Sequence, residues 1–140
     1  MLVLDTDHVS ALGYGTNAGH RLRDRLLASG DDTATTIITV EEQLRGWLAE
    51  IHRLHDIKRQ IPAYQRLQER IAFFARWTIL PWENEAAEAF LTLRKQGVRI
   101  GSMDLKIASI ALAHNCTLLT RNTSDFSHVA GLRVQNWLEP

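Results

Sequence analysis

Short runs of strand-forming residues alternate with longer segments of helical periodicity, and this alternation limits the possible folds more than any other feature. The first run, Leu2-Val3-Leu4, is continuously apolar, which is typical of a strand buried on both faces of a parallel sheet. Further strands are expected at 35–39, 78–80 and 117–120, with an edge strand at 132–137. The pattern predicts an α/β fold with a central, mostly parallel sheet of four to five strands flanked by helices.

The segments between these runs carry apolar residues at helical spacing. They predict helices at about 8–12, 17–29, 40–53, 62–76, 84–96 and 103–115. Asn84 and Ser102 are the expected N-caps of the last two, and Gly30 and Gly97 are expected to end helices. Since no repeat or linker is visible, we expect one domain over residues 1–140.

Composition excludes several classes of protein. The single cysteine, Cys116, excludes an internal disulfide framework, and its apolar neighbours predict a buried structural thiol. The formal net charge of +0 argues against a strongly cationic, non-specific nucleic-acid binder. No stretch approaches the roughly 18 to 20 apolar residues of a membrane span, and no secretory signal is visible. These observations favour a cytoplasmic protein without a membrane partner.

Four carboxylates follow strand-like runs or stand near the expected starts of helices. They are Asp5, Glu42, Asp104 and Asp125. Loops and helix N-termini converge beyond the carboxyl ends of parallel strands, so all four are expected to face one site. An oxygen-only site suits Mg²⁺ or Mn²⁺, and such cations assist phosphodiester cleavage.

Each acid also has an alternative structural role. Glu42 fits the last position of a capping box that begins at Thr39. Asp104 lies where a negative charge stabilises the helix dipole, and Asp125 is a candidate turn cap. Asp7 is interpreted first as the cap of the short helix after the first strand, and second as an added charge at the edge of the site.

Basic residues are concentrated in the middle of the chain. From residue 45 to residue 76 there are seven Lys or Arg against three Asp or Glu, a local surplus of four. Either this is a solvated helix face, or it is a ridge that contacts phosphates beside the acidic site. The candidates for RNA contacts are Arg45, Arg53, Lys58 and Arg59.

Five motifs in this order resemble the PIN-domain ribonucleases, above all the VapC toxin family of bacterial type II toxin–antitoxin pairs. The matching stretches are 4–7 (Leu-Asp-Thr-Asp), 38–42 (Ile-Thr-Val-Glu-Glu) with Gly46, 97–104 (ending Gly-Ser-Met-Asp), 119–126 (ending Ser-Asp-Phe) and 131–133 with Trp137. Each motif alone is weak, but the ordered set covers the chain from end to end. The resemblance implies a PIN fold, a Mg²⁺- or Mn²⁺-dependent endoribonuclease, an RNA substrate with tRNA among the candidates, a homodimer and a small antitoxin as partner.

The resemblance also assigns roles to single residues. Asp5 and Asp104 match the family's principal metal ligands, and Glu42 matches its helix glutamate because a glycine follows four residues later. Asp125 matches the acidic residue before a phenylalanine. Asn122 matches a polar residue that is acidic in some members. All four acids are therefore expected to ligate the metal or hold water.

Residues beside the acids also match the family, and two alternative functions remain open from the sequence. Thr6 and Thr120 match small hydroxyl residues that support the acids, and members commonly carry Asn where Asp7 stands. One alternative function is a haloacid-dehalogenase-type phosphatase with Asp5 as nucleophile, Asp7 as acid/base and Lys106 as the required lysine. The other is a non-catalytic PIN-like module that docks on an antitoxin or on RNA.

Overall fold

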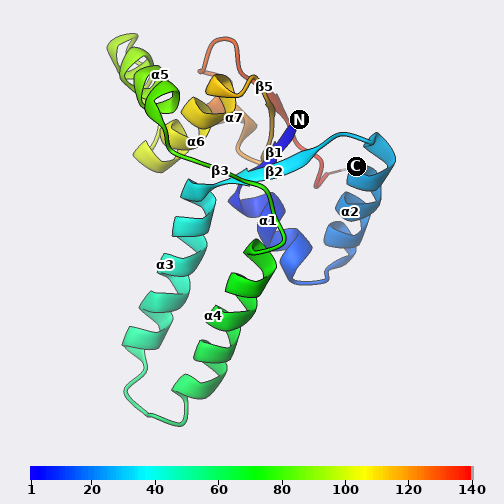
Figure 1. The fold of residues 1–140 in the computed structure, drawn as a ribbon, viewed down its shortest axis with the longest axis vertical. Coiled ribbons are helices and arrows are strands. Elements are labelled where there is room, and N and C mark those ends of the chain that lie inside the picture. The colour runs from blue at the N-terminus through cyan, green and yellow to red at the C-terminus, as the bar shows by residue number, and fades with distance from the viewer. Residues whose placement is uncertain (140) are drawn as a thin grey trace.

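Five parallel strands lie between two layers of helices in the computed structural model, which describes residues 1–139 (Figure 1). The strands are β1 (Leu2–Leu4), β2 (Thr33–Thr36), β3 (Ile79–Leu80), β4 (Thr117–Leu119) and β5 (Arg133–Gln135). The helices are α1 (Thr6–Gly13), α2 (Asn17–Ser29), α3 (Ile37–Arg53), α4 (Gln60–Phe74), α5 (Asn84–Lys95), α6 (Ser102–Ala113) and α7 (Thr123–Phe126). The predicted α/β fold is confirmed.

The order of the strands places a topological switch point at the centre of the sheet. The order is β3-β2-β1-β4-β5, and every neighbouring pair is parallel. From β1 the chain adds β2 and β3 on one side, and β4 and β5 on the other. Loops diverge beyond the carboxyl ends of β1 and β4, which is where open α/β sheets bind ligands. Asp5 directly follows β1, and Thr120 directly follows β4.

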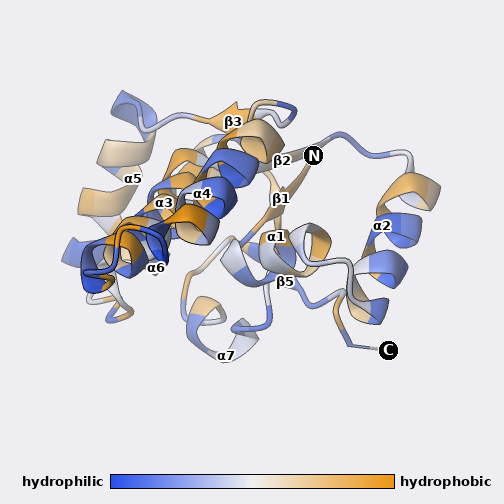
Figure 2. Cartoon of the chain, turned by 90° about the horizontal axis from the view of Figure 1, so that it is seen from below, coloured by the Kyte–Doolittle hydropathy of each residue, from blue (hydrophilic) through white to orange (hydrophobic). Residues whose placement is uncertain are grey.

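Alternating side chains of β1 build two hydrophobic cores, one on each face of the sheet. Val3 packs with residues of α5, α6 and α7, whereas Leu2 and Leu4 pack with residues of α1, α2 and α4. Successive side chains of a strand point to opposite faces, which explains the division. All three are buried, as the continuously apolar run predicts. Figure 2 shows β1 in orange between helices that carry both blue and orange stretches.

Helices α3 and α4 form an antiparallel hairpin that extends away from the sheet (Figure 1). Its tip is ordered by Asp56, whose Oδ1 accepts hydrogen bonds from the backbone N–H groups of Lys58 at 2.8 Å and Arg59 at 3.1 Å. Pro62 lies in the first turn of α4, where the missing backbone N–H of proline costs no helical hydrogen bond. Because α3 begins directly after β2, the hairpin starts at the carboxyl edge of the sheet.

The predicted second strand exists, but its bounds of 35–39 were wrong, since β2 spans Thr33–Thr36. The strand ends at Thr36, and α3 begins at Ile37. The hydroxyl of Thr36 accepts a hydrogen bond from the backbone N–H of Thr39 at 3.1 Å and caps the helix. This cap overrides the β-propensity of the following β-branched residues. Glu42 therefore lies in the second turn of α3, and the capping box headed by Thr39 does not form.

Two other predicted caps were also wrong. Gly101 occupies the N-cap position of α6, so Ser102 is the first helical residue, and no side chain caps this helix. Glu83 occupies the N-cap position of α5 in place of Asn84, again without a capping hydrogen bond from its side chain. The expected burial of Cys116 is confirmed at 3% exposure. No helix within residues 1–139 is long and apolar enough to cross a membrane.

Replacement of two helical glycines by alanine should change the free energy of unfolding in opposite directions. A Cβ on Gly19 would lie 2.1 Å from the backbone oxygen of Ala11, so α1 and α2 would have to separate. We expect Gly19→Ala to lower the free energy of unfolding by about 1–3 kcal/mol. A Cβ on Gly46 in α3 meets nothing within 4 Å, so Gly46→Ala should raise it by about 0.5–1 kcal/mol. Urea denaturation of both variants checks the pair, and equal shifts would contradict the close crossing of α1 and α2.

Candidate active site

Four acids from four different elements gather at the carboxyl edge of the sheet. Asp5 stands between β1 and α1, Glu42 in α3, Asp104 in the first turn of α6, and Asp125 in α7. The charge of Asp104 acts on both Asp5 and Glu42, and Asp125 acts on Asp104. The structure therefore brings the predicted acids together, with Asp104 at their centre. They are called the acidic site below.

Asp5 is a buried carboxylate held by two hydrogen bonds. Its Oδ1 accepts from the backbone N–H of Thr6 at 2.7 Å, and its Oδ2 accepts from the hydroxyl of Thr120 at 2.7 Å. Burial raises the pKa of Asp5 to about 7, and the charges of Asp7 and Asp104 act in the same direction. A carboxyl group whose pKa is raised this far by burial and by neighbouring charges is typical of a functional site.

Glu42 has one oxygen held and one oxygen without a partner. Its Oε2 accepts a hydrogen bond from the hydroxyl of Thr6 at 3.1 Å. Its Oε1 is buried and has no hydrogen-bond partner among the described residues. Burial raises the pKa of Glu42, and the charge of Asp104 adds to this effect. A buried carboxylate oxygen without a partner is costly, and coordination to a cation would satisfy it.

Asn122 bridges the other two acids. Its Nδ2 donates to Oδ2 of Asp104 at 3.3 Å and to Oδ2 of Asp125 at 3.0 Å. Burial raises the pKa of Asp104, and the charge of Asp125 raises it further. Asp104 is half-buried, whereas Asp125 is exposed. The predicted supporting residues Thr6, Thr120 and Asn122 thus all contact the acids.

The interpretation of Asp7 as a helix cap was wrong. Asp5 is the N-cap of α1, and Asp7 lies in the first turn. Oδ1 of Asp7 lies 2.6 Å from Nδ1 of His8, and Oδ2 accepts from the backbone N–H of Arg121 at 2.9 Å. Burial acts to raise the pKa of Asp7, but the hydrogen bonds from His8 and Arg121 outweigh it and lower the pKa. Asp7 is therefore an ionised group whose two oxygens already have partners.

The chemistry of the acidic site fits a hard divalent cation. Its donors are carboxylate oxygens, three of the four acids have raised pKa values, and one oxygen of Glu42 is orphaned. Within residues 1–139 no three Asp, Glu, His or Cys side chains already stand at the spacing of a metal-ligand set. A cation held by these acids would offset their mutual repulsion.

A groove that the sequence did not predict leads away from Glu42. A cavity of about 450 Å³ is lined by Glu42, Tyr14, Trp47 and Arg66, among others. A second cavity of about 360 Å³ is also lined by Tyr14, Trp47 and Arg66, and in addition by Arg70. The spacing of Arg66 and Arg70 by four residues on α4 was the sequence signal for one shared face. The groove joins the exposed side chains of Tyr14 and Arg66 to the acidic site, whereas Trp47 is half-buried and Arg70 is buried.

The four basic residues first predicted to contact RNA stand elsewhere. Arg45 pairs with Glu41 on the exposed face of α3, and Arg53 pairs with Glu50 at 2.6 Å. Lys58 and Arg59 lie at the tip of the α3–α4 hairpin. None of the four lines either of the two cavities of this groove. Their role in binding RNA stays a prediction.

Comparisons with known proteins agree with this architecture. The PIN domain family model matches residues 2–132. A protein named Ribonuclease VapC from Rickettsia bellii is 28% identical over 137 residues, which are 95% of this chain and 93% of the relative. Ribonuclease VapC2 of Haemophilus influenzae is 36% identical over 70 residues, which are 47% of this chain and 53% of that protein. In several such local matches the chain spans only about a third to a half of the relative's length.

A solved structure has the same fold. The crystal structure of VapBC2 from Rickettsia felis, bound to a DNA fragment from the promoter, superposes with a TM-score of 0.73 at 23% identity, covering 97% of this chain and 98% of that one. At this identity the likeness concerns the fold alone. The family match, in contrast, extends over nearly the whole sequence. The five-stranded parallel sheet, the acids at its carboxyl edge and this match together show that the chain belongs to the PIN-domain family.

Proposed function

We propose that the protein is a divalent-metal-dependent endoribonuclease, acting through one domain that spans residues 1–140 as the toxin of a toxin–antitoxin pair. The observation that carries this proposal is the acidic site, with the orphaned, buried oxygen of Glu42 at its edge. The relatives named Ribonuclease VapC support the reaction class. Mg²⁺ or Mn²⁺ is the proposed cofactor, and Asp5, Glu42, Asp104 and Asp125 are its proposed ligands or water holders.

A bound Mg²⁺ or Mn²⁺ would supply Lewis-acid chemistry and positive charge at the scissile phosphodiester. The protein supplies the orientation of the acids. Thr6 and Thr120 hold the two oxygens of Asp5, and Asn122 holds one oxygen of Asp104. Glu42, with its free oxygen and raised pKa, is suited to take a proton from the attacking water.

We propose that a single RNA strand enters along the groove beside Glu42. Tyr14 is 58% exposed and lines this groove together with Trp47. Aromatic rings provide stacking platforms for unpaired bases, and nearby arginines neutralise phosphates. The guanidinium of Arg66 lies 5.6 Å from the ring centroid of Trp47. The same part of the groove therefore offers both a stacking surface for a base and a positive charge for a phosphate. The structure favours unpaired RNA over a duplex because stacking requires exposed base faces.

A small antitoxin and a second copy of this chain are the proposed protein partners. The solved structure from Rickettsia felis is of VapBC2, and this likeness supports the proposal that the present protein also has a protein partner. Leu26, Leu27, Phe73 and Trp77 line a partly apolar cavity of about 520 Å³ away from the acidic site. This cavity is the proposed contact for an apolar antitoxin segment.

The alternative of a haloacid-dehalogenase-type phosphatase has no support. That mechanism needs Asp7 as a free acid/base and Lys106 beside the phosphate. Both oxygens of Asp7 are held by His8 and Arg121, and the ammonium of Lys106 lies over the ring of Trp82, 5.9 Å from its centroid. Membership in the PIN-domain family also favours phosphodiester cleavage.

Removal of divalent metal tests the proposed function. The protein should cleave unstructured RNA internally with Mn²⁺ or Mg²⁺, and the rate should fall by at least about a hundredfold in EDTA, because the acids alone leave the phosphate charge unbalanced. Cleavage is followed by gel electrophoresis of an end-labelled oligonucleotide. Restoration of activity by added Mn²⁺ is the control. Cleavage that is equally fast in EDTA would contradict metal dependence. Mn²⁺ binding without any RNA cleavage would favour a non-catalytic module.

A further inference from the structure

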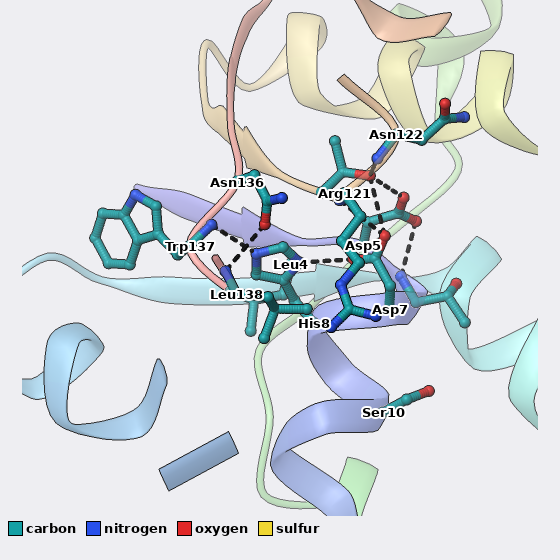
Figure 3. A network of polar contacts seen from close by, with 12 residues as sticks. Leu4, Asp5, Asp7, His8, Ser10, Arg121, Asn122, Asn136, Trp137 and Leu138 are labelled. Atoms are coloured by element: carbon teal, nitrogen blue, oxygen red, sulfur yellow. Dashed lines mark hydrogen bonds and ion pairs between the residues drawn. The ribbon is translucent and has the colours of Figure 1, made fainter. Parts of the chain in front are cut away.

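A fully buried imidazole connects the acidic site to the C-terminal segment. The side chain of His8 is 0% exposed; its Nδ1 lies 2.6 Å from Oδ1 of Asp7, and its Nε2 lies 3.1 Å from the backbone nitrogen of Trp137 (Figure 3). A backbone N–H can only donate, so Nε2 accepts and the proton resides on Nδ1. His8 is thus neutral, with both nitrogens engaged, and is unavailable as a general base.

The second oxygen of Asp7 holds the loop that follows β4. Oδ2 of Asp7 accepts a hydrogen bond from the backbone N–H of Arg121 at 2.9 Å, across 114 residues of sequence. Arg121 is the middle residue of the segment Thr120–Asn122, called the β4 loop below. The backbone N–H of Asn122 donates to the Thr120 hydroxyl at 3.1 Å, which tightens the same segment.

The β4 loop in turn contacts three of the four acids. The hydroxyl of Thr120 donates to Asp5 at 2.7 Å, and the amide of Asn122 donates to Asp104 at 3.3 Å and to Asp125 at 3.0 Å. A displacement of this loop would therefore change the relative positions of all three acids. Replacement of groups that orient metal ligands in this way commonly lowers metal affinity by about tenfold or more.

We propose that Asp7 and His8 form a positioning pair, which fixes the β4 loop and so sets the spacing of the acids that bind the metal. Asp7 is then a support for the acidic site and is not itself a ligand. The inference rests on the proposed metal site. It adds that the backbone of Trp137 fixes the tautomer of His8, so the C-terminal segment participates in the geometry of the site.

The pair requires an aspartate at position 7. In Asp7→Asn the amide has one acceptor oxygen and one donor nitrogen, but it faces two donors, Nδ1–H of His8 and N–H of Arg121. A switch of the His8 tautomer would only move the donor–donor conflict to Trp137. One hydrogen bond is therefore lost in every arrangement, although the two side chains have nearly the same shape.

A double-mutant cycle with Mn²⁺ titration calorimetry tests the proposal. We expect Asp7→Asn to weaken Mn²⁺ binding about tenfold or more. With His8→Leu, the Nδ1–H donor is gone and the oxygen of Asn at position 7 can accept from Arg121, so the same replacement should cost at least about fivefold less. Loss of one negative charge weakens Mn²⁺ binding in both backgrounds and cancels in the comparison. The coupling between the two sites thus reports positioning alone.

Amide hydrogen exchange provides a readout that does not depend on metal. In Asp7→Asn the metal-free protein should lose protection at the N–H of Arg121. His8→Asn retains a donor near Nδ1, so it should keep Mn²⁺ affinity within about threefold while exchange at Trp137 accelerates. If His8→Leu fails to fold, the exchange at Arg121 in Asp7→Asn and the Mn²⁺ affinity of His8→Asn still test the pair.

The possible failures are distinguishable. Equal effects of Asp7→Asn in both backgrounds, with unchanged exchange at Arg121, would overturn the positioning pair and leave Asp7 as a charge or a ligand. A folded wild-type protein that binds no Mn²⁺ would overturn the proposed metal site instead. In that case the exchange at Arg121 still decides whether Asp7 holds the β4 loop.

Discussion

Replacement of Asp104 by asparagine is expected to lower the rate of RNA cleavage by about a thousandfold. Asp104 lies at the centre of the acidic site, where its charge acts on Asp5 and Glu42. Asparagine keeps an oxygen that can accept the hydrogen bond from Asn122, so the fold is retained while the charge is lost. A cation contributes several kcal/mol of transition-state stabilisation, and about 4 kcal/mol corresponds to a thousandfold in rate.

The measurement is single-turnover cleavage of a labelled RNA with saturating Mn²⁺. Asp24→Asn is the matched control, because it removes the same charge from an exposed position in α2 and should leave the rate unchanged. Asp125→Asn should cause a smaller loss than Asp104→Asn, since Asp125 is exposed. An Asp104→Asn protein that has a native circular dichroism spectrum and wild-type activity would end the proposed mechanism.

The parts of the acidic site that follow from local sequence were predictable. The apolar run before Asp5 fixes a buried central strand, and a residue that follows such a strand stands at the carboxyl edge of the sheet. Asp104 follows from a helix start that was misplaced by only one residue. Even a boundary that is misplaced by one residue, as for α6, leaves the carboxylate at the carboxyl edge of the sheet.

The parts that depend on contacts across the sequence were not predictable. The local pattern around Asp7 fits a helix cap, and nothing nearby indicates its bond to Arg121, 114 residues away. Glu42 fits a capping box equally well, until the Thr36 hydroxyl caps the helix one turn earlier. The groove at Trp47 requires the pairing of α3 with α4, which periodicity alone does not give. For Asp7 the predicted local cap replaced a contact across the sequence, and for Glu42 one local cap was mistaken for another three residues away.

The metal-free protein should become less stable as the pH rises from about 4 to about 7. The pKa of Asp5 is about 7 in the folded state, whereas the unfolded chain releases this proton near the ordinary pKa of 3.8. Between these values the folded state binds more protons, so the free energy of unfolding falls with rising pH. The raised pKa values of Glu42 and Asp104 act in the same direction. The lowered pKa of Asp7 acts below this window, where acid removes stability.

A shift of this size in Asp5 corresponds to about 4 kcal/mol as an upper limit. Urea denaturation in EDTA at about pH 5 and about pH 8 measures the effect. In Asp5→Asn most of the pH dependence should disappear, and the metal-free variant should be more stable than wild type at about pH 8. Mn²⁺ should stabilise wild type more at the higher pH, because it competes with protons for the same oxygens. If Asp5→Asn instead destabilises the metal-free protein at about pH 8, then the contribution of Asp5 as the N-cap of α1 outweighs the cost of its buried charge, and the proposed pH dependence is wrong.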